Sequence, residues 1–290
     1  MKSAIDHDIT ALAVARWATA RDARMSEIMQ ALVRHLHSLA REVRLTESEW
    51  SAAMTWLART GQISDSKRAE FILASDVLGL SMLVVEMNQR RDPGATPATV
   101  LGPFHIEGSP HLPYGVNMAD GVGGIPLYIT GAVHDLHGEA VTGAVLDVWQ
   151  ADAHGMYESQ LGEEAPRLRA KYTSQSDGTY CVRTVAPLGY SIPMDGPVGE
   201  LISRTDISPY RPAHIHFLVT APGCEPLTTH LFEKGAPYLD SDVVFGTKAE
   251  LVIEFERRRP GPTPDGDRSE VPWLLAKNDF VLQPTCTRSR

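Results

Sequence analysis

Apolar residues in the first 90 positions recur at the spacing of an α-helix. Between Ser26 and Val43 they lie three or four residues apart, which predicts a helix with one apolar face and Ser26 as its N-cap. Thr46-Glu47-Ser48-Glu49 has the pattern of a capping box and predicts a second helix. A third helix is predicted from about Ser66 to Met87. Its second half is apolar almost all round, so we expect it to be buried in the fold or in a subunit interface.

The helical spacing of apolar residues ends at Arg91-Asp92-Pro93-Gly94, because proline and glycine do not continue a helix. Residues 100–124 read as a loop. Short runs of β-branched and apolar residues follow, separated by turn residues. This alternation of short strands and turns predicts an antiparallel sandwich or barrel. The expected fold class is α+β, with a helical dimerisation domain at residues 1–95 and a β-sandwich catalytic domain at 96–290. The predicted strands are Leu127–Val133, Ala144–Gln150, Ala170–Ser174, Thr179–Val185, His214–Thr220, Thr228–Phe232, Glu250–Phe255 and Phe280–Gln283.

Composition narrows the class of protein. The chain has 290 residues and is 43% apolar, which is enough for a large core. Its net charge of −9 disfavours a nucleic-acid partner. We see no signal peptide and no run of ~20 apolar residues, and therefore expect a soluble cytoplasmic protein without membrane insertion. Cys181, Cys224 and Cys286 are too scattered for a disulfide framework and are expected to be free thiols.

Candidate chemistry begins with two histidines in the strand predicted at 214–220. His214 and His216 are two positions apart, so in a strand both side chains point to the same face, as two ligands of one metal ion would. The alternative is that both are ordinary half-buried strand residues. His35 and His37 have the same spacing in a predicted helix, where positions two apart do not face each other, and we read them as surface residues.

Other polar residues near the predicted strand ends leave two interpretations open. A tyrosine in a glycine-containing loop, such as Tyr157 or Tyr190, is more often an aromatic plug than a ligand. Arg211 stands three residues before His214, where it would serve either catalysis or a surface salt bridge. His230 is polar and near the expected site, and we assign it no role beyond a contact with the ligands.

Several motifs resemble those of the intradiol ring-cleaving dioxygenases, the non-haem ferric enzymes that open catechols between their hydroxyls. The matching residues span most of the chain: Leu101-Gly102-Pro103-Phe104, Asp147-Val148-Trp149-Gln150-Ala151, Tyr157, Tyr190 and Arg211-Pro212-Ala213-His214-Ile215-His216. Within that family the chain is most similar to the hydroxyquinol 1,2-dioxygenases. That similarity rests on Gly189-Tyr190-Ser191-Ile192-Pro193 followed by Asp195-Gly196-Pro197-Val198-Gly199, and on the helix residues Leu73, Ser75, Asp76 and Leu78.

The resemblance implies one Fe(III) per subunit, bound by Tyr157, Tyr190, His214 and His216, with water or hydroxide as a fifth ligand. Phenolate is a hard anionic ligand that favours the ferric state. Tyr190 and Arg211 would act in catalysis. The implied substrate pocket is a flat apolar slot in which the carboxylate of Asp76 would bind a third ring hydroxyl; otherwise Asp76 is a helix residue bonded to backbone or to an arginine. The pocket residues are Leu73, Asp76, Val100, Leu101, Gly102, Pro103, Phe104, Ile192, Pro193, Arg211 and Val244.

The implied activity is cleavage of hydroxyquinol by O2 to 3-hydroxy-cis,cis-muconate, the enol form of maleylacetate. Catechol or a chlorocatechol is the alternative substrate, and a metal-free β-sandwich binding module is the alternative of a different class. Similar enzymes are homodimers joined through their amino-terminal helices, and some hold lipid there. The sequence does not decide whether this chain binds lipid.

Overall fold

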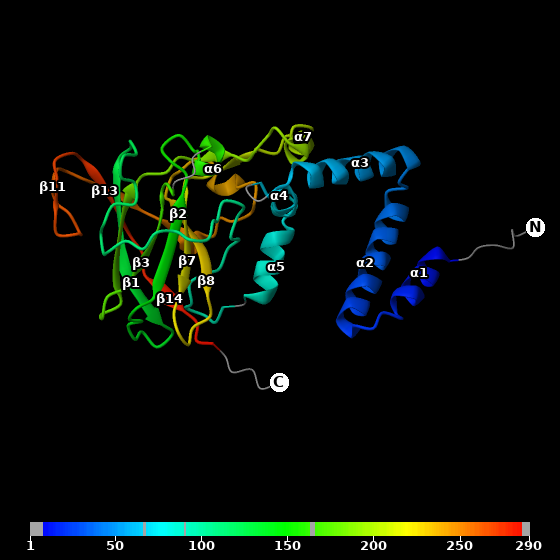
Figure 1. The fold of residues 1–290 in the computed structure, drawn as a ribbon, viewed down its shortest axis with the longest axis horizontal. Coiled ribbons are helices and arrows are strands. Elements are labelled where there is room, and N and C mark those ends of the chain that lie inside the picture. The colour runs from blue at the N-terminus through cyan, green and yellow to red at the C-terminus, as the bar shows by residue number, and fades with distance from the viewer. Residues whose placement is uncertain (1–7, 66–67, 90, 163–165, 286–290) are drawn as a thin grey trace, which may run out of the picture. The chain divides into compact units, whose positions relative to one another are not determined.

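The computed structural model describes residues 8–65, 68–89, 91–162 and 166–285 (Figure 1). Cys286 and the predicted helix start at Ser66 lie outside these ranges. The chain divides into two compact units, residues 1–59 and 60–290. The helices between residues 70 and 88 belong to the same compact unit as the sheets, and the division into domains at residues 95 and 96 stays a prediction.

The first unit is helical and contains α1 (Ile9–Trp17), α2 (Ala23–Glu42) and most of α3 (Glu47–Ile63). Asp22, not the predicted Ser26, caps α2, because its carboxylate accepts the Met25 N–H at 2.6 Å. Ser26 lies one turn inside the helix. The capping box of α3 is confirmed, since Thr46 and Glu49 each accept the other's backbone N–H.

The apolar face predicted for α2 is largely uncovered within the described chain. Ile28, Leu32, Leu36 and Leu39 keep between 45% and 55% of their surface exposed. On the same helix His35 is exposed and His37 shares a 2.9 Å hydrogen bond with Thr10, so neither faces a metal partner. An exposed apolar stripe of this length is typical of a surface that is covered by another chain.

The second unit begins with two short helices where one was predicted. Helix α4 (Glu70–Val77) ends just before Gly79, which has a φ of +72°, and α5 (Leu80–Asn88) starts after it. The prediction of one continuous helix was wrong because the apolar pattern runs on across a glycine that adopts the left-handed conformation. Leu73, Ala74 and Met82 are buried, whereas Leu78 and Met87 are mostly exposed.

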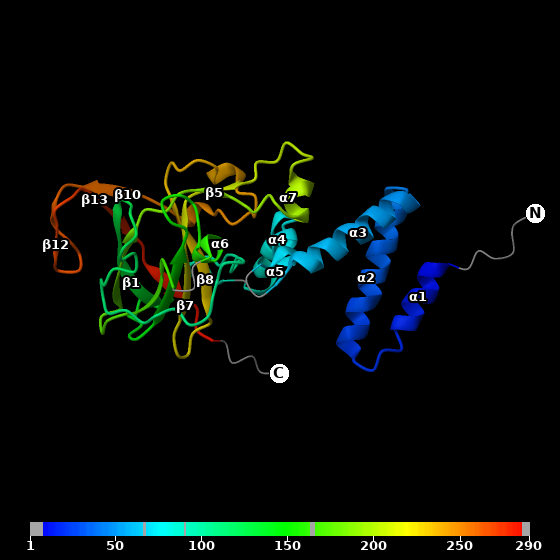
Figure 2. The ribbon, with the colours of Figure 1, turned by 45° about the horizontal axis from the view of Figure 1, so that its top comes forward.

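Two sheets of the second unit pack over one apolar core (Figures 1 and 2). The first has the order β10-β13-β1-β14, with β4 also paired to β1, and the second has the order β3-β2-β7-β8-β9. The sheets are mixed, not purely antiparallel as predicted, because β1 pairs in parallel with β13 and β14, and β8 in parallel with β9. The strands are β1 (Pro126–Asp135), β2 (Val145–Gln150), β3 (Arg169–Thr173), β4 (Thr179–Val185), β7 (His214–Thr220), β8 (Leu227–Glu233), β9 (Val252–Ile253), β10 (Phe255–Arg258), β13 (Trp273–Lys277) and β14 (Phe280–Leu282).

Shorter elements complete the fold. The helices α6 (Glu158–Leu161) and α7 (Pro197–Ile202) lie in loops, as does the two-stranded pair β5 (Tyr190–Ser191) and β6 (Tyr210–Arg211). A second small pair is β11 (Gly261–Pro262) with β12 (Arg268–Ser269), and η1 (Leu239–Ser241) and η2 (Ala249–Leu251) are 3-10 turns. Among the described residues, none of the helices combines the length and apolarity that a membrane span requires.

Candidate metal centre

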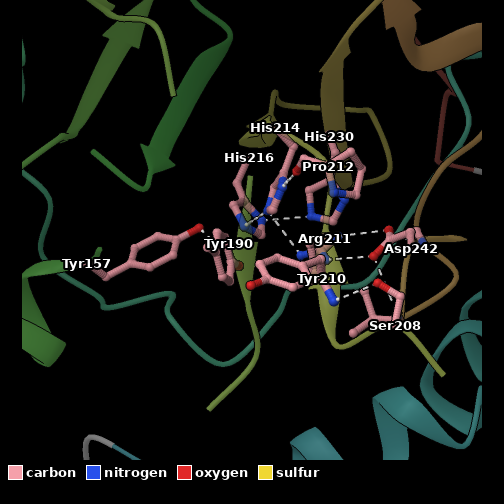
Figure 3. A network of polar contacts seen from close by, with 12 residues as sticks. Tyr157, Tyr190, Ser208, Tyr210, Arg211, Pro212, His214, His216, His230 and Asp242 are labelled. Atoms are coloured by element: carbon pink, nitrogen blue, oxygen red, sulfur yellow. Dashed lines mark hydrogen bonds and ion pairs between the residues drawn. The ribbon is translucent and has the colours of Figure 1, made fainter. Parts of the chain in front are cut away.

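Strand β7 carries the two histidines on one face, as the sequence predicts. Its apolar residues Ile215 and Phe217 point into the core, so His214 and His216 project the other way. Their Nε2 atoms approach to 3.1 Å, and both side chains are almost completely buried (Figure 3). Each imidazole therefore directs the same nitrogen toward one point.

Tyr157 and Tyr190 reach the same place from two loops. Tyr157 directly precedes α6 and Tyr190 starts β5, and their hydroxyl oxygens are 3.5 Å apart (Figure 3). The rings of Tyr190 and His214 have centroids 5.5 Å apart, and those of Tyr157 and His216 6.5 Å. The structure thus gathers all four predicted ligand side chains.

Hydrogen bonds fix how the imidazoles are presented. His214 Nδ1 lies 2.7 Å from the Pro212 carbonyl, which can only accept, so Nδ1 carries the proton and Nε2 presents a lone pair, toward which Arg211 Nη1 also points. His216 Nδ1 contacts His230 Nε2 at 2.7 Å. If His216 also carries its proton on Nδ1, its Nε2 has a lone pair as well. The Nε2 lone pairs of His214 and His216 would then face each other across 3.1 Å, and a cation bound by both atoms would stabilise this arrangement.

Burial keeps these groups neutral in the absence of a cation. It lowers the pKa of His214 to about 3, with Arg211 acting in the same direction, and holds the pKa of His216 well below the usual range. Burial also raises the pKa of Tyr157 and Tyr190 above that of a free phenol. Neutral imidazoles are ready ligands, whereas the phenols would become anionic only beside a strong positive charge.

The donor set fits a hard trivalent ion. Within the described ranges, no three His, Cys, Asp or Glu side chains are grouped so that they alone could hold a metal ion, so a metal at this site needs the phenol oxygens. Two phenolates and two imidazoles suit Fe(III) better than zinc, which prefers thiolate, imidazole and carboxylate ligands.

Arg211 forms a buried ion pair with Asp242, a residue that sequence reasoning missed. Arg211 Nε donates to Asp242 Oδ1 at 3.0 Å, and Nη1 lies 3.0 Å from His214 Nε2 (Figure 3). Asp242 also accepts the backbone N–H groups of Val244 and Gly246. Arg211 is therefore not in a surface salt bridge, and its charge lies beside the four candidate ligands.

Neighbours hold the candidate ligands in place on three sides. Trp149 stacks on the ring of His216 with centroids 4.7 Å apart, and His230 faces His216 across the β7–β8 pair. Gly102 has a φ of +77°, and a Cβ there would lie 3.2 Å from His216 Cε1. A glycine at 102 thus lets the 100–104 loop approach the site closely.

A buried ion pair supports the Tyr157 side of the site. The Phe104 ring stacks on Tyr157 with centroids 4.2 Å apart, and the Phe104 carbonyl accepts a 3.1 Å hydrogen bond from Arg169 Nη2. Arg169 Nε also donates to Glu158, the residue that follows Tyr157. The sequence shows no pattern that predicts this ion pair.

A slot beside the four side chains brings together the predicted pocket residues, except Leu101, which is 41% exposed and outside the lining. Asp76 is 2% exposed, and its Oδ1 has no hydrogen-bond partner. Burial raises the pKa of Asp76. The slot is lined by Leu73, Asp76, Val100, Gly102, Pro103, Phe104, Tyr190, Ile192, Pro193, Arg211 and Val244.

Comparison with protein families gives matches over both parts of the chain. Residues 100–284 match the family model described as "Dioxygenase", and residues 22–96 match the model described as "Catechol dioxygenase N terminus". The 6-chlorohydroxyquinol 1,2-dioxygenase of Cupriavidus pinatubonensis is 48% identical over 280 residues, which cover 96% of this chain and 98% of that protein. The hydroxyquinol 1,2-dioxygenase of Nocardioides simplex is 46% identical over 91% of this chain and 90% of its own length.

Solved structures of similar proteins have the same fold. The hydroxyquinol 1,2-dioxygenase from Pseudomonas putida DLL-E4 superposes with a TM-score of 0.88 at 45% identity, covering 95% of this chain and 97% of its own. The catechol 1,2-dioxygenase from Pseudomonas arvilla C-1 gives a TM-score of 0.85 at 26% identity, covering 97% of this chain and 93% of its own.

Proposed function

The chain belongs to the dioxygenase family of the hydroxyquinol and catechol 1,2-dioxygenases, and from this membership we propose that it cleaves hydroxyquinol, benzene-1,2,4-triol. O2 would be the second substrate and 3-hydroxy-cis,cis-muconate, the enol form of maleylacetate, the product. The observation that carries the proposal is the convergence of Tyr157, Tyr190, His214 and His216 at one end of a slot that contains a buried carboxylate.

We propose that these four side chains hold one Fe(III) per subunit. The ion would supply Lewis acidity, so that a deprotonated diol bound to it would become reactive toward O2. Tyr190 lies both in the ligand cluster and in the slot lining, so in its ionised form the phenolate oxygen could accept a substrate proton as the diol enters. Tyr157 is stacked on Phe104, and we assign it a permanent ligand role.

Arg211 would contribute permanent positive charge next to the reacting ring. The residue is 3% exposed and lines the slot, and its guanidinium is oriented by Asp242. In a buried site a fixed charge needs no reorganisation when negative charge develops on the substrate, and it acts more strongly than in water. The residue would therefore stabilise carbanion character in the ring without exchanging a proton.

Asp76 favours hydroxyquinol over the alternative substrates catechol and chlorocatechol. The rest of the slot is mainly apolar, and an apolar wall cannot favour a ring that has one more hydroxyl. A buried carboxylate oxygen without a partner can accept a hydrogen bond from that hydroxyl. The names of the relatives at 46% and 48% identity support the same choice.

The colour of the pure protein and its steady-state kinetics test the proposal together. Tyrosinate bound to Fe(III) absorbs visible light, so the iron-loaded protein should be burgundy and should turn over hydroxyquinol with a higher kcat/KM than catechol. A colourless protein that binds no iron would instead support the alternative of a metal-free binding module.

Ligand variants make the assignment specific. His216→Ala should lose colour, iron and turnover, because a site reduced to three protein donors holds iron poorly. Tyr190→Phe should keep some iron while losing turnover, whereas Tyr157→Phe should shift the visible band of the substrate complex. His35→Ala, in the exposed helical pair of the same spacing, is the matched control and should change none of these. Retention of iron and turnover by His216→Ala would refute the site.

We also propose that the protein is a cytoplasmic homodimer joined through its amino-terminal helices, with lipid as a candidate occupant of that interface. The exposed apolar face of α2 and the exposed residues Leu83 and Met87 of α5 support an interface. Light scattering at micromolar concentration should give twice the chain mass of 31.7 kDa. A monomer mass would contradict the dimer, and lipid extraction followed by mass spectrometry would show whether lipid is bound.

A further inference from the structure

The motif Asp195-Gly196-Pro197-Val198-Gly199 does not line the metal centre, yet two of its residues, Asp195 and Val198, form hydrogen bonds to side chains at or just before the start of α4. Asp195 accepts two hydrogen bonds from one guanidinium, from Arg68 Nη1 and Arg68 Nη2, both at 2.9 Å. Arg68 Nε donates to Glu70 Oε2 at 3.0 Å. We call Arg68, Glu70 and Asp195 the mouth clamp.

Glu70 ties the clamp to the backbone of the same motif. Its side chain is 1% exposed, and Oε1 accepts the Val198 N–H at the first turn of α7 at 3.0 Å. A Cβ at Gly196 would lie 2.4 Å from Glu70 Oε1 and 2.5 Å from Arg68 Nη2, so only glycine fits there without displacing the clamp. The motif residues are thus matched to the two α4 side chains.

The clamp lies next to the proposed substrate slot. A cavity of about 510 Å³ is lined by all three clamp residues and shares Leu73 and Phe104 with the slot. Leu73 lies on α4 one turn after Glu70, and Pro193 of the slot lining lies two residues before Asp195. The clamp therefore joins two segments that both line the slot.

We propose that the mouth clamp determines specificity, by holding α4, with Leu73 and Asp76, at a fixed distance from Ile192 and Pro193. This inference rests on the proposed function of the slot. Asp195 is 72% exposed, and an exposed ion pair adds little to the free energy of unfolding. Its bidentate geometry nevertheless fixes the relative position of two chain segments, and that position sets how closely the slot fits a bound ring.

Arg68→Gln and Asp195→Asn test the clamp, because both remove the charge and keep a polar side chain; Asp195→Asn also keeps the shape. Each should raise KM for hydroxyquinol with kcat nearly unchanged, and lower the ratio of kcat/KM for hydroxyquinol to that for catechol by roughly two- to fivefold. The double variant should show the same loss as either single variant, because the pair acts as a unit. Arg68→Lys should restore part of the ratio, since it keeps the charge without the bidentate geometry.

Salt supplies a test that needs no variant. Raising the ionic strength to about 1 M shortens the screening length to roughly 3 Å, so the ratio should fall in the wild type and stay constant in Arg68→Gln. Arg268→Gln is the matched control, because Arg268 pairs with Glu270 on an exposed hairpin outside the slot lining.

The outcomes separate the clamp from the proposed function. If the wild-type protein cleaves neither hydroxyquinol nor catechol, the function itself fails. If the wild type cleaves hydroxyquinol but the ratio is the same in both single variants and at high salt, the clamp hypothesis is wrong. A lower thermal stability with an unchanged ratio would make the three residues structural and would also overturn it.

Discussion

Replacement of Asp242 by Asn should destabilise the protein far more than an ordinary surface substitution. The side chains of Arg211 and Asp242 are only 4% and 2% exposed, so the neutral amide would leave a buried guanidinium without its counter-charge. Breaking a buried pair from one side costs roughly 3–5 kcal/mol, against a total stability of about 5–15 kcal/mol. A domain of this size loses about 2–4 °C of Tm per kcal/mol, so we expect a fall of roughly 6–20 °C.

The same substitution has a predicted pH dependence. Burial alone would raise the pKa of Asp242, but Arg211 beside it holds the pKa below the ordinary value. A carboxyl whose pKa is lowered in the folded state contributes stability above its unfolded pKa of about 4, and that contribution is lost as the pH falls through the folded pKa. The difference in Tm between wild type and Asp242→Asn should therefore be full at neutral pH and shrink in acid.

Thermal unfolding followed by circular dichroism measures this effect, with kcat recorded on the same samples. Asp240→Asn is the matched control. It is the same substitution, two residues away, at an exposed position in a turn. A second control replaces both partners, Arg211→Met with Asp242→Asn, and should be more stable than Asp242→Asn alone. If Asp242→Asn unfolds within about 2 °C of Asp240→Asn, the ion pair is not a buried structural contact and the reasoning fails.

Three other substitutions have distinct expected results. Asp76→Ala should lower kcat/KM for hydroxyquinol by roughly tenfold to a hundredfold while catechol changes little and the iron colour remains; equal losses on both substrates would make Asp76 a structural residue. Gly102→Ala should weaken iron retention, measured by visible absorbance, because its Cβ would lie 3.2 Å from His216; Gly94→Ala, with nothing within 4 Å, should not, and equal losses would contradict the close-approach argument. Burial raises the pKa of Cys181 to about 12, so stability is lost as the pH rises from about 9. Cys181→Ala should therefore flatten the alkaline fall in Tm, and an unchanged slope would show that this thiol does not titrate on unfolding.

Local patterns predicted the elements whose partners and turns are close in sequence. Strands β4 and β7 occupy the predicted ranges, 179–185 and 214–220, because alternation and flanking turn residues define both. Strand β13 (Trp273–Lys277) was missed, since a five-residue apolar run has no distinctive period and its partner β1 lies far upstream. The break at Gly79 was missed because the apolar spacing of a helix is the same on either side of it.

The residues of the site differ in whether the sequence alone could predict them. The alternation of side chains along a strand was enough to predict His214 and His216 on one face. The two tyrosines were predicted as ligands from the family motifs and not from their spacing. Asp242 could not be found in this way, because the bond to Arg211 joins a loop to β6, 31 positions apart, and an aspartate in a loop has no signature of burial. Three-dimensional contact, not pattern, identifies such residues.

Strand β1 pairs with β4, β13 and β14, and this has a consequence for the order in which the molecule can assemble. Leu127 pairs with Leu274 and Val133 with Phe280, while a Cβ at Gly131 would collide with the Asn278 carbonyl that crosses between them. Strands β13 and β14 leave the ribosome after the other strands of the two sheets, and contacts between segments so far apart in sequence form slowly. Four of the five strands of the other sheet, β3, β2, β7 and β8, lie before residue 234 and include both histidines, and only the two-residue strand β9 follows. These four strands can therefore pair while β13 and β14 are still being synthesised.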